Sequence, residues 1–297
     1  MDLDIFIQQV INGLNTGSIY ALVAIGYTMV YGIIRLINFA HGEIMMFGAY
    51  FAFLFAVAIP VQLPFLLIVV ISMSMAALMG VLIEKLAYKR LRKAPRISAL
   101  ITAIGMSLFL QNLALLVFGA NPKVMPALVS KQPIDFLGFQ ISQMTLTTIS
   151  MSIIIMVLLT LFVRFTKPGK AMRAVSQDKE AALLMGINVN RIISLTFAIG
   201  SALGALGGLF YSIAFTQIAP TMGVMPGLKA FVAAVFGGIG NIFGAMIGGY
   251  VIGFVEIFAK GNQYLNQWAD AIVFAILILV LLFKPSGILG KNTKEKV

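Results

Sequence analysis

The 297-residue chain contains no cysteine and a single histidine, His41. Without cysteine it has no disulfide framework, no reactive thiolate and no thiolate ligand for a metal. One histidine is too few for most zinc centres. The sequence around it matches neither the HExxH pattern of metalloproteases nor the GxSxG pattern of serine hydrolases. These absences indicate a protein that is not an enzyme and holds no metal.

Charge is also scarce, because only 10% of the residues are charged while 60% are hydrophobic, and the mean hydropathy is +1.01. Soluble domains carry about 25% charged residues. No GxxxxGK[ST] phosphate-binding loop is present, so we expect no ATP site or other cofactor on this chain. The net charge of +11 lies in short segments between apolar runs, which is typical of membrane-protein loops rather than of a nucleic-acid-binding face.

The uncharged runs predict an all-α polytopic membrane protein with about eight or nine transmembrane segments in a single domain, residues 1–297. A helix needs about 20 apolar residues to cross the bilayer. Segments of that kind are expected within 5–34, 44–83 (two crossings, with a turn at Pro60 and Pro64), 97–118, 145–163, 192–214, 230–255 and 268–283.

Basic residues gather in three places, at 85–96, at 164–191 and from Lys284 to the end. The positive-inside rule favours a cytoplasmic location for all three. They share one side only if the chain reverses within 227–259, so we expect a broken or re-entrant segment near 227–241, with an outward helix near 241–259. The N-terminus is then outside and the C-terminus cytoplasmic. The alternative is a single kinked helix and an exception to the charge rule.

Glycines recur every four residues in two of the predicted helices. The positions with a helix-packing role are Gly200, Gly204 and Gly208, then Gly240, Gly244 and Gly248. Such spacing lets helix backbones approach closely in a membrane. We interpret these glycines as packing sites within the chain, and contact with a partner membrane subunit stays open as a second interpretation.

Polar residues within apolar surroundings are candidates for a transport pathway or a helix break, since they are costly in lipid. The candidates are Asn38, His41 and Glu43, together with Gly237, Gly238, Gly240 and Asn241. Lys229 and Glu256 are interpreted differently, as residues near helix ends whose side chains snorkel or cap. No acidic residue is expected securely at the middle of the membrane.

The segment 165–190 is too polar to cross the membrane. Asp178 is expected to cap a short helix that runs through Glu180, Ala181 and Ala182 and ends at Gly186. Its apolar residues would form an exposed patch, which favours a docking surface. The alternative is an amphipathic helix lying on lipid headgroups.

This segment resembles the EAA loop of ABC importer permeases through Glu180-Ala181-Ala182-x-x-x-Gly186-Ile187-Asn188. Other stretches resemble branched-chain amino acid permeases of the LivH type. They are Asn12-Gly13, Gly17-Ser18-x-Tyr20-Ala21-Leu22, Gly26-Tyr27-Thr28-Met29-Val30-Tyr31-Gly32, Ile37-Asn38-Phe39-Ala40-His41-Gly42-Glu43, Ala103-Ile104-Gly105-Met106-Ser107, Gly227-Leu228-Lys229-Ala230-Phe231, Gly237-Gly238-Ile239-Gly240 and Pro285-x-Gly287-Ile288-Leu289-Gly290.

The resemblance implies a transmembrane permease in the plasma (inner) membrane of a bacterium, importing leucine, isoleucine or valine. It implies a LivM-type permease partner, two ATPases of the LivG and LivF type that hold the ATP, and an extracytoplasmic binding protein. The ATPase-coupling residues would be Asp178, Glu180, Ala181, Ala182, Gly186 and Asn188.

Three other functions remain open at this point. Urea and short-chain amide importers share the same motifs. An ion-coupled secondary transporter could use the broken segment at 237–241, and a non-transporting membrane scaffold is the last. The EAA-like loop favours the ABC permease over the latter two.

Overall fold

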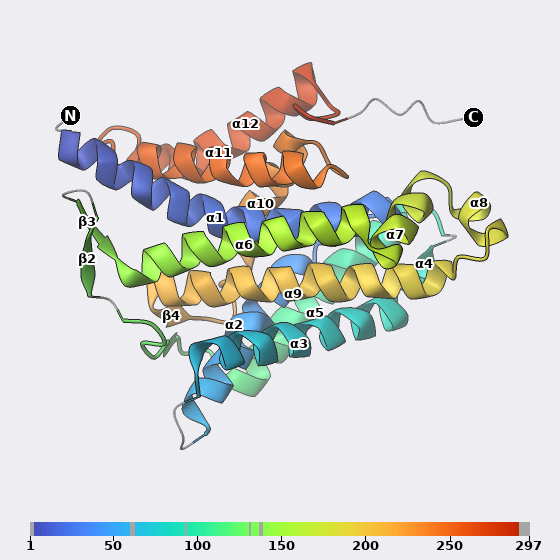
Figure 1. Ribbon diagram of the computed structural model, residues 1–297, viewed down its shortest axis with the longest axis horizontal. Helices are drawn as coiled ribbons and strands as arrows, with labels where there is room; N and C mark the ends of the chain where they lie inside the picture. The colour runs from blue at the N-terminus through green and yellow to red at the C-terminus, as the bar shows by residue number, and fades with distance from the viewer. Residues whose placement is uncertain (1–2, 60–62, 93, 131, 137–138, 291–297) are drawn as a thin grey trace.

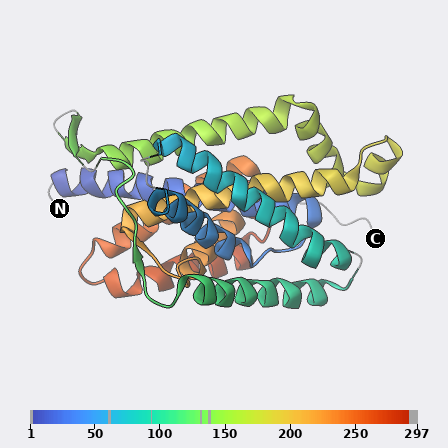
Figure 2. The ribbon, with the colours of Figure 1, turned by 90° about the horizontal axis from the view of Figure 1, so that it is seen from below.

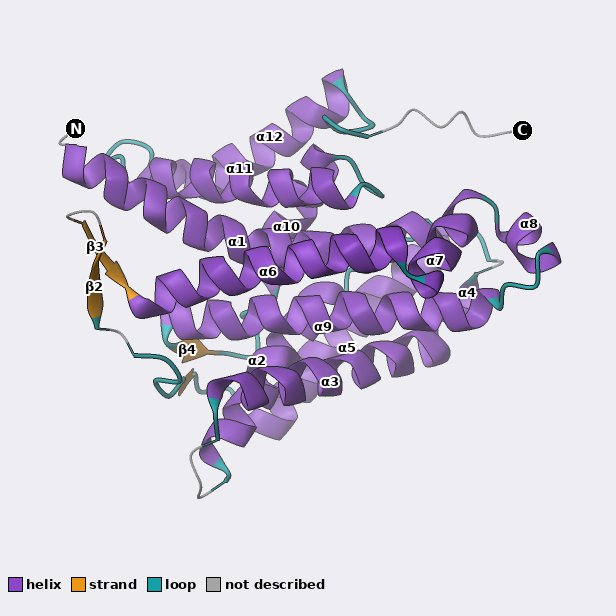
Figure 3. Cartoon of the chain, in the orientation of Figure 1, coloured by secondary structure: helices purple, strands orange, loops and turns teal. Residues whose placement is uncertain are grey.

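The computed structural model describes residues 3–290, except 60–62, 93, 131 and 137–138. The described chain is almost entirely helical (Figure 3). The helices are α1 (Leu3–Ile34), α2 (His41–Val57), α3 (Phe65–Ile83), α4 (Lys89–Leu91), α5 (Arg96–Phe118), α6 (Gln143–Phe165), α7 (Lys167–Gln177), α8 (Lys179–Leu184), α9 (Val189–Phe215), α10 (Val224–Gly237), α11 (Ile242–Lys260) and α12 (Ala269–Phe283). A π-helical turn, Glu84–Tyr88, joins α3 to α4, and a 3-10 turn, Asn266–Trp268, precedes α12.

Four short strands form two antiparallel pairs. They are β1 (Lys123–Val124), β2 (Pro133–Phe136), β3 (Phe139–Ser142) and β4 (Gln217–Ile218), and β1 pairs with β4 while β2 pairs with β3. Three of these strands lie within the polar stretch between α5 and α6, at the same end of the bundle as the start of α1 (Figure 1).

In the described part of the chain, seven helices are long and apolar enough to cross a membrane, and α2 and α10 are shorter apolar helices. Together they match the predicted eight or nine segments, so the polytopic all-α fold is confirmed. The uncharged runs end close to the helix ends because lipid cannot satisfy charged groups or free backbone groups.

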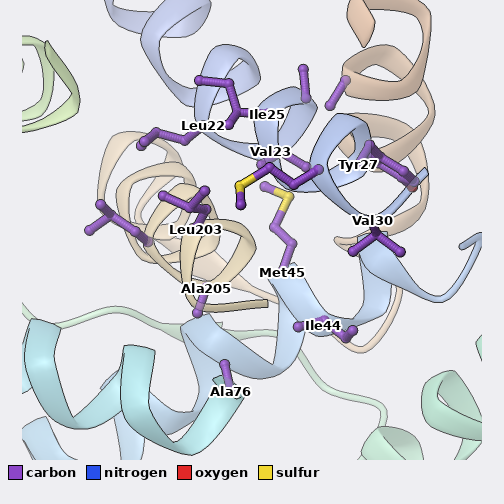
Figure 4. Close-up of a cluster of buried hydrophobic side chains, with 14 of the residues drawn as sticks. Leu22, Val23, Ile25, Tyr27, Val30, Ile44, Met45, Ala76, Leu203 and Ala205 are labelled. Atoms are coloured by element: carbon purple, nitrogen blue, oxygen red, sulfur yellow. The ribbon is translucent and has the colours of Figure 1, made fainter. Parts of the chain in front are cut away.

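Helix α1 is the centre of the bundle and is buried along most of its length from Gly13 to Ile34. A helix that is apolar all round has to be covered on every side. Leu22, Val23 and Ile25 of α1 meet Met45 of α2 and Leu203 of α9 in the core (Figure 4). On another side α11 runs antiparallel to α1, so that Gly249 faces Ala21 and Gly253 faces Gly17.

Helices α2 and α10 both begin inside the bundle instead of at its surface. The chain folds back after α1, so that the His41 ring, in the first residue of α2, lies beside Gly26 of α1 and Gly204 of α9. The chain likewise returns after α9, so that Gly223, which precedes α10, packs against Gly42. Because α1 and α9 are antiparallel, the two returning segments enter from opposite ends.

The predicted reversal near 227–241 is present. Helices α10 and α11 form a hairpin, with Gly248 against Ala233 and Gly244 against Gly237, and Gly240 in the turn lies near Gly32 of α1. The single kinked helix is therefore wrong. The additional return at 216–223 and the start of α2 within the bundle were not predicted.

The basic segments that the structure describes gather at one end of the bundle. Figure 1 shows α4, α7 and α8 at this end, opposite the start of α1. The segment after α12 reaches it too, since Ile288 and Leu289 donate backbone hydrogen bonds to Phe236 and Gly237 at the end of α10. Of the basic residues counted above, Lys93, Lys291, Lys294 and Lys296 lie outside the described residues.

The glycine contacts predict unequal effects of two matched substitutions. A Cβ at Gly208 would overlap the carbonyl oxygen of Met45, whereas nothing lies within 4 Å of a Cβ at Gly105. We expect Gly208→Ala to lower the free energy of unfolding by about 1–3 kcal/mol through overpacking. Gly105→Ala should be neutral or stabilising by up to ~1 kcal/mol. Thermal unfolding of the purified chain in detergent measures both, and equal effects would contradict the packing described.

Candidate functional site

Segment 165–190 forms two short helices whose ends are fixed by side chains. The hydroxyl of Thr166 accepts a hydrogen bond from Gly169 N and starts α7. Asp178 Oδ1 accepts from Glu180 N at 2.9 Å and from Ala181 N at 3.0 Å, which caps α8. Gly186 follows α8 with φ +80°, and Asn188 Oδ1 then accepts from Arg191 N to cap α9. The capping side chains therefore set the shape of this segment.

Helix α8 projects beyond the bundle at the end where the basic segments lie (Figure 1). Its last turn exposes Leu183, Leu184 and Met185, with 63%, 87% and 82% of their surface accessible. Glu180 and Ala181 are also exposed, whereas Ala182 is buried and holds α8 onto its own loop. An exposed apolar patch on a short, rigidly capped helix is typical of a surface that binds another protein.

The base of this loop is positively charged. Burial, together with the positive charges of Arg35 and Arg92, lowers the pKa of the Lys179 amine. Arg35 directly follows α1 and has φ +60°, a backbone conformation uncommon for a residue other than glycine. The loop therefore stands next to the point where the chain turns back toward α2.

A buried polar cluster connects the start of α9 to the π-helical turn. Glu84 accepts a hydrogen bond from Ser194 Oγ at 2.7 Å and forms an ion pair with Arg92. Arg92 Nη1 also donates to Asn190 Oδ1 at 2.6 Å. Asn190 and Ser194 lie in the first turns of α9, immediately after the loop, so movement of the loop would act on this cluster.

The same turn also reaches the segment that returns into the bundle. Tyr88 Oη donates to Asn38 Oδ1 at 2.8 Å, and both residues are buried. Hydrogen bonds and ion pairs thus link the end of the 165–190 loop, through the π-helical turn, to the residues that precede α2. Single π-helical turns often occur at functional sites.

Asn38, His41 and Glu43 all lie buried where α2 begins. The His41 ring is 4.5 Å from the Tyr27 ring, centroid to centroid, and Glu43 Oε1 accepts from Ser107 Oγ of α5 at 3.2 Å. Sequence reasoning placed no acidic residue securely inside the membrane, but Glu43 lies within the bundle. It also did not foresee that Gly42 would meet the start of α10.

The other predicted break residues lie elsewhere. Gly237, Gly238, Gly240 and Asn241 form the turn between α10 and α11, at the end of the bundle. Asn241 Nδ2 donates to Leu289 O at 2.9 Å, which ties this turn to the segment after α12. A cavity of about 90 Å³ opens beside Gly240, lined also by Thr28 and Arg173. The predicted pathway residues therefore fall into two groups, which approach each other where Asn38 and Ile239 line a small pocket.

Lys229 and Glu256 pair with each other, which corrects their interpretation as snorkelling or capping residues. Lys229 Nζ lies 2.7 Å from Glu256 Oε1 and 2.6 Å from Asp270 Oδ1. Glu256 also accepts from Lys260 at 2.5 Å and from Tyr20 Oη at 2.6 Å. The network joins α1, α10, α11 and α12. The signal in the sequence was opposite charge on neighbouring predicted helices.

No group of three His, Asp or Glu side chains in the described part of the chain is placed to hold a metal ion. The remaining features of the site are a projecting apolar helix, a polar connection from it into the bundle, and a buried pair of helix starts.

Comparisons with known proteins agree along almost the whole chain. A family model described as branched-chain amino acid transport system / permease component matches residues 9–281. The high-affinity branched-chain amino acid transport system permease protein LivH of Escherichia coli K12 is 44% identical, and BraD of Pseudomonas aeruginosa, which carries the same description, is 43% identical. Each comparison covers 98% of both chains. A probable LivH of Methanocaldococcus jannaschii is 28% identical over 94% of this chain and 90% of its own.

The buried ion network predicts a large loss of stability when its central cation is removed. Lys229→Met leaves Asp270 without a cation and Glu256 with Lys260 alone, so we expect a cost toward the lower end of the range of about 3–5 kcal/mol for breaking a buried pair. The matched variant Lys260→Met removes a cation whose side chain is 43% exposed, so we expect less than ~1 kcal/mol. Thermal unfolding of both variants in detergent tests this, and equal losses would show that Lys229 is not the centre of the network.

Proposed function

Because the chain belongs to the family of branched-chain amino acid transport system permease components, we propose that it is the transmembrane permease of an ABC importer for leucine, isoleucine and valine. The observation that carries the proposal is the 44% identity over nearly the whole length of both chains, since a shared substrate is expected at that similarity. The projecting helix α8 supports the ABC mechanism, because a permease without an ATP site has to be moved from outside.

In the proposed complex, α8 docks with the cytoplasmic ATPases through Glu180, Ala181 and the exposed apolar turn after them. Asp178, Ala182, Gly186 and Asn188 act indirectly by fixing the shape of the 165–190 loop. The positive-inside rule supports a cytoplasmic location for this end of the bundle, which puts the start of α1 outside and the segment after α12 inside.

The other partners follow from the same assignment. Two ATPases of the LivG and LivF type hold the ATP, a LivM-type permease completes the membrane part, and an extracytoplasmic binding protein delivers the amino acid to the end that carries the β2–β3 pair. The complex belongs in the plasma (inner) membrane of a bacterium.

Transport then depends on how ATPase movement reaches the interior of the permease. We assign this to the polar connection from α9 through Glu84 and Arg92 to Tyr88 and Asn38. Hydrogen bonds with buried partners resist separation, since an unpaired buried polar group costs more than the bond itself contributes. Displacement of α8 would therefore shift the residues that precede α2.

Reversing the charge of Glu180 should detach the ATPases. We expect Glu180→Lys to abolish co-purification of the ATPase subunits and uptake of labelled leucine, while membrane insertion is unchanged. The control is Asp135→Lys, an identical reversal at an exposed residue of β2, which should retain the ATPases. Unchanged co-purification and uptake in Glu180→Lys would refute the docking assignment. Parallel uptake of valine and urea distinguishes the amino-acid importer from a urea importer.

Removing one hydroxyl should uncouple ATP hydrolysis from transport. Tyr88→Phe deletes the hydrogen bond to Asn38, worth about 0.5–1.5 kcal/mol, so we expect several-fold fewer leucine molecules carried per ATP hydrolysed. Tyr250→Phe is the matched control, because its hydroxyl lies 3.2 Å from Ser18 Oγ between α1 and α11, away from the connection. An equal leucine-to-ATP ratio in both variants would argue against this route.

A further inference from the structure

Glu43 differs from the other buried glutamates in its partners. Three glutamates are buried in the described part of the chain, Glu43, Glu84 and Glu256. Glu84 is paired with an arginine and Glu256 with two lysines. Glu43 accepts one hydrogen bond, from Ser107, and no cation of the described residues lies within ion-pair distance.

The carboxylate of Glu43 is therefore incompletely satisfied. Its Oε2 atom is buried without a hydrogen-bond partner, and the whole residue is only 2% exposed. Glu43 lies in the first turn of α2, where the helix dipole favours a negative charge. The dipole is the main compensation among the described residues, so an ionised Glu43 requires a cation that these residues do not supply.

The face of α2 that carries Glu43 is otherwise apolar. Phe47 and Tyr50 follow at helical spacing on this face, and both lie against Phe118 of α5, with ring centroids 6.3 and 4.0 Å away. The hydroxyl of Tyr50 is also buried without a partner. We call this contact, formed by Glu43, Phe47, Tyr50, Ser107 and Phe118, the α2–α5 seam.

Helix α5 is the least firmly held wall of the seam. It lies along the lower edge of the bundle in Figure 2, and most of its length faces outward. Its buried side consists of Leu110 and three alanines, Ala103 and Ala114 among them. Among the described residues α5 takes part in no ion pair, and nothing lies within 4 Å of a Cβ at its glycine, Gly105, so α5 is held to the seam mainly by side-chain packing.

We propose that the Glu43 end of the α2–α5 seam is a transient binding site for the amino acid, in which Glu43 accepts the substrate's ammonium group while the aliphatic side chain lies against Phe47, one helical turn away. The inference rests on the proposed function, because it requires a substrate with an ammonium group and an apolar side chain. An ammonium group supplies three donors, which fits a carboxylate oxygen without a partner. A single charge-assisted contact keeps the site weak enough for onward release.

The test compares uptake of labelled leucine by the complete complex, reconstituted in vesicles, with ATP hydrolysis stimulated by the binding protein. Glu43→Gln keeps the shape and an acceptor for Ser107 but removes the charge. We expect maximal uptake to fall about tenfold, the effect of losing one charge-assisted hydrogen bond, while ATP hydrolysis and assembly remain. Ser107→Ala leaves the carboxylate in place, so uptake should fall less.

Ser72→Ala is the matched control. It removes a buried hydrogen bond, 2.7 Å from Ser72 Oγ to Gly48 O, on the α3 side of the same helix, and uptake should be unchanged. If Glu43→Gln takes up leucine at the wild-type rate, the proposal is overturned. The native carboxyl group would then be neutral, with Ser107 as its only partner, and its charge would play no part in transport. Equal losses in Glu43→Gln and Ser107→Ala, or failure of Glu43→Gln alone to assemble, would assign Glu43 a structural role and also overturn it.

The two proposals fail in different ways. A wild-type complex that carries no leucine, isoleucine or valine overturns the proposed function and the ammonium site together. A wild-type complex that carries leucine, with Glu43→Gln equally active, overturns the ammonium site alone.

Discussion

The structure depends on one constraint, that backbone polar groups inside a membrane must find their partners within the protein. Two helices, α2 and α10, begin in the interior, so each leaves free N–H groups there. Carbonyl groups of the preceding turns accept from several of them, since His41 N donates to Asn38 O, Ile44 N to Ala40 O and Val224 N to Thr221 O. The two starts also pack together, with Gly42 against Gly223 and Gly227. A Cβ at Gly42 would overlap the carbonyl oxygen of Gly223, so the glycines permit a contact that covers both helix starts with protein.

The ion pairs follow from the same constraint, because charged groups inside a membrane also need partners within the protein. At the proposed outer end, Lys229, Glu256 and Asp270 hold α10 to α11 and α12, and at the proposed inner end Glu84 and Arg92 hold the π-helical turn to α9. Helix α10 is therefore held by the ion pairs of its one charged residue, Lys229, whereas α2 has no paired charge among the described residues. Since α2 is reached instead through Asn38, it is the helix that movement of the loop would displace first.

Much of the fold follows from the sequence, because lipid requires long uninterrupted apolar runs. The ends of α5, α6 and α9 lie within a few residues of the predicted limits, and the charge rule required the reversal that Gly240 and Asn241 form. The start of α2 could not be predicted. Asn38, His41 and Glu43 stood out in the sequence only as candidates for a pathway or a helix break. The burial of the His41 ring depends on Gly26 and Gly204, which are distant in sequence and leave space for it. The opposite charges of Lys229, Glu256 and Asp270 are visible in the sequence, but which of them pair depends on α10 starting within the bundle.

The cost of burying a charge also bears on the proposed role of Glu43 in the α2–α5 seam. A buried ion pair would fix the seam closed, because separating its two charges costs several kcal/mol. A carboxylate that is stabilised only by a helix dipole and one hydroxyl keeps α2 and α5 weakly joined and offers its free oxygen to a passing cation. Glu43 in this environment destabilises the closed seam. In the proposed site, this destabilisation helps the substrate to enter and leave. The lack of a counter-charge among the described residues is thus what the proposed ammonium site requires.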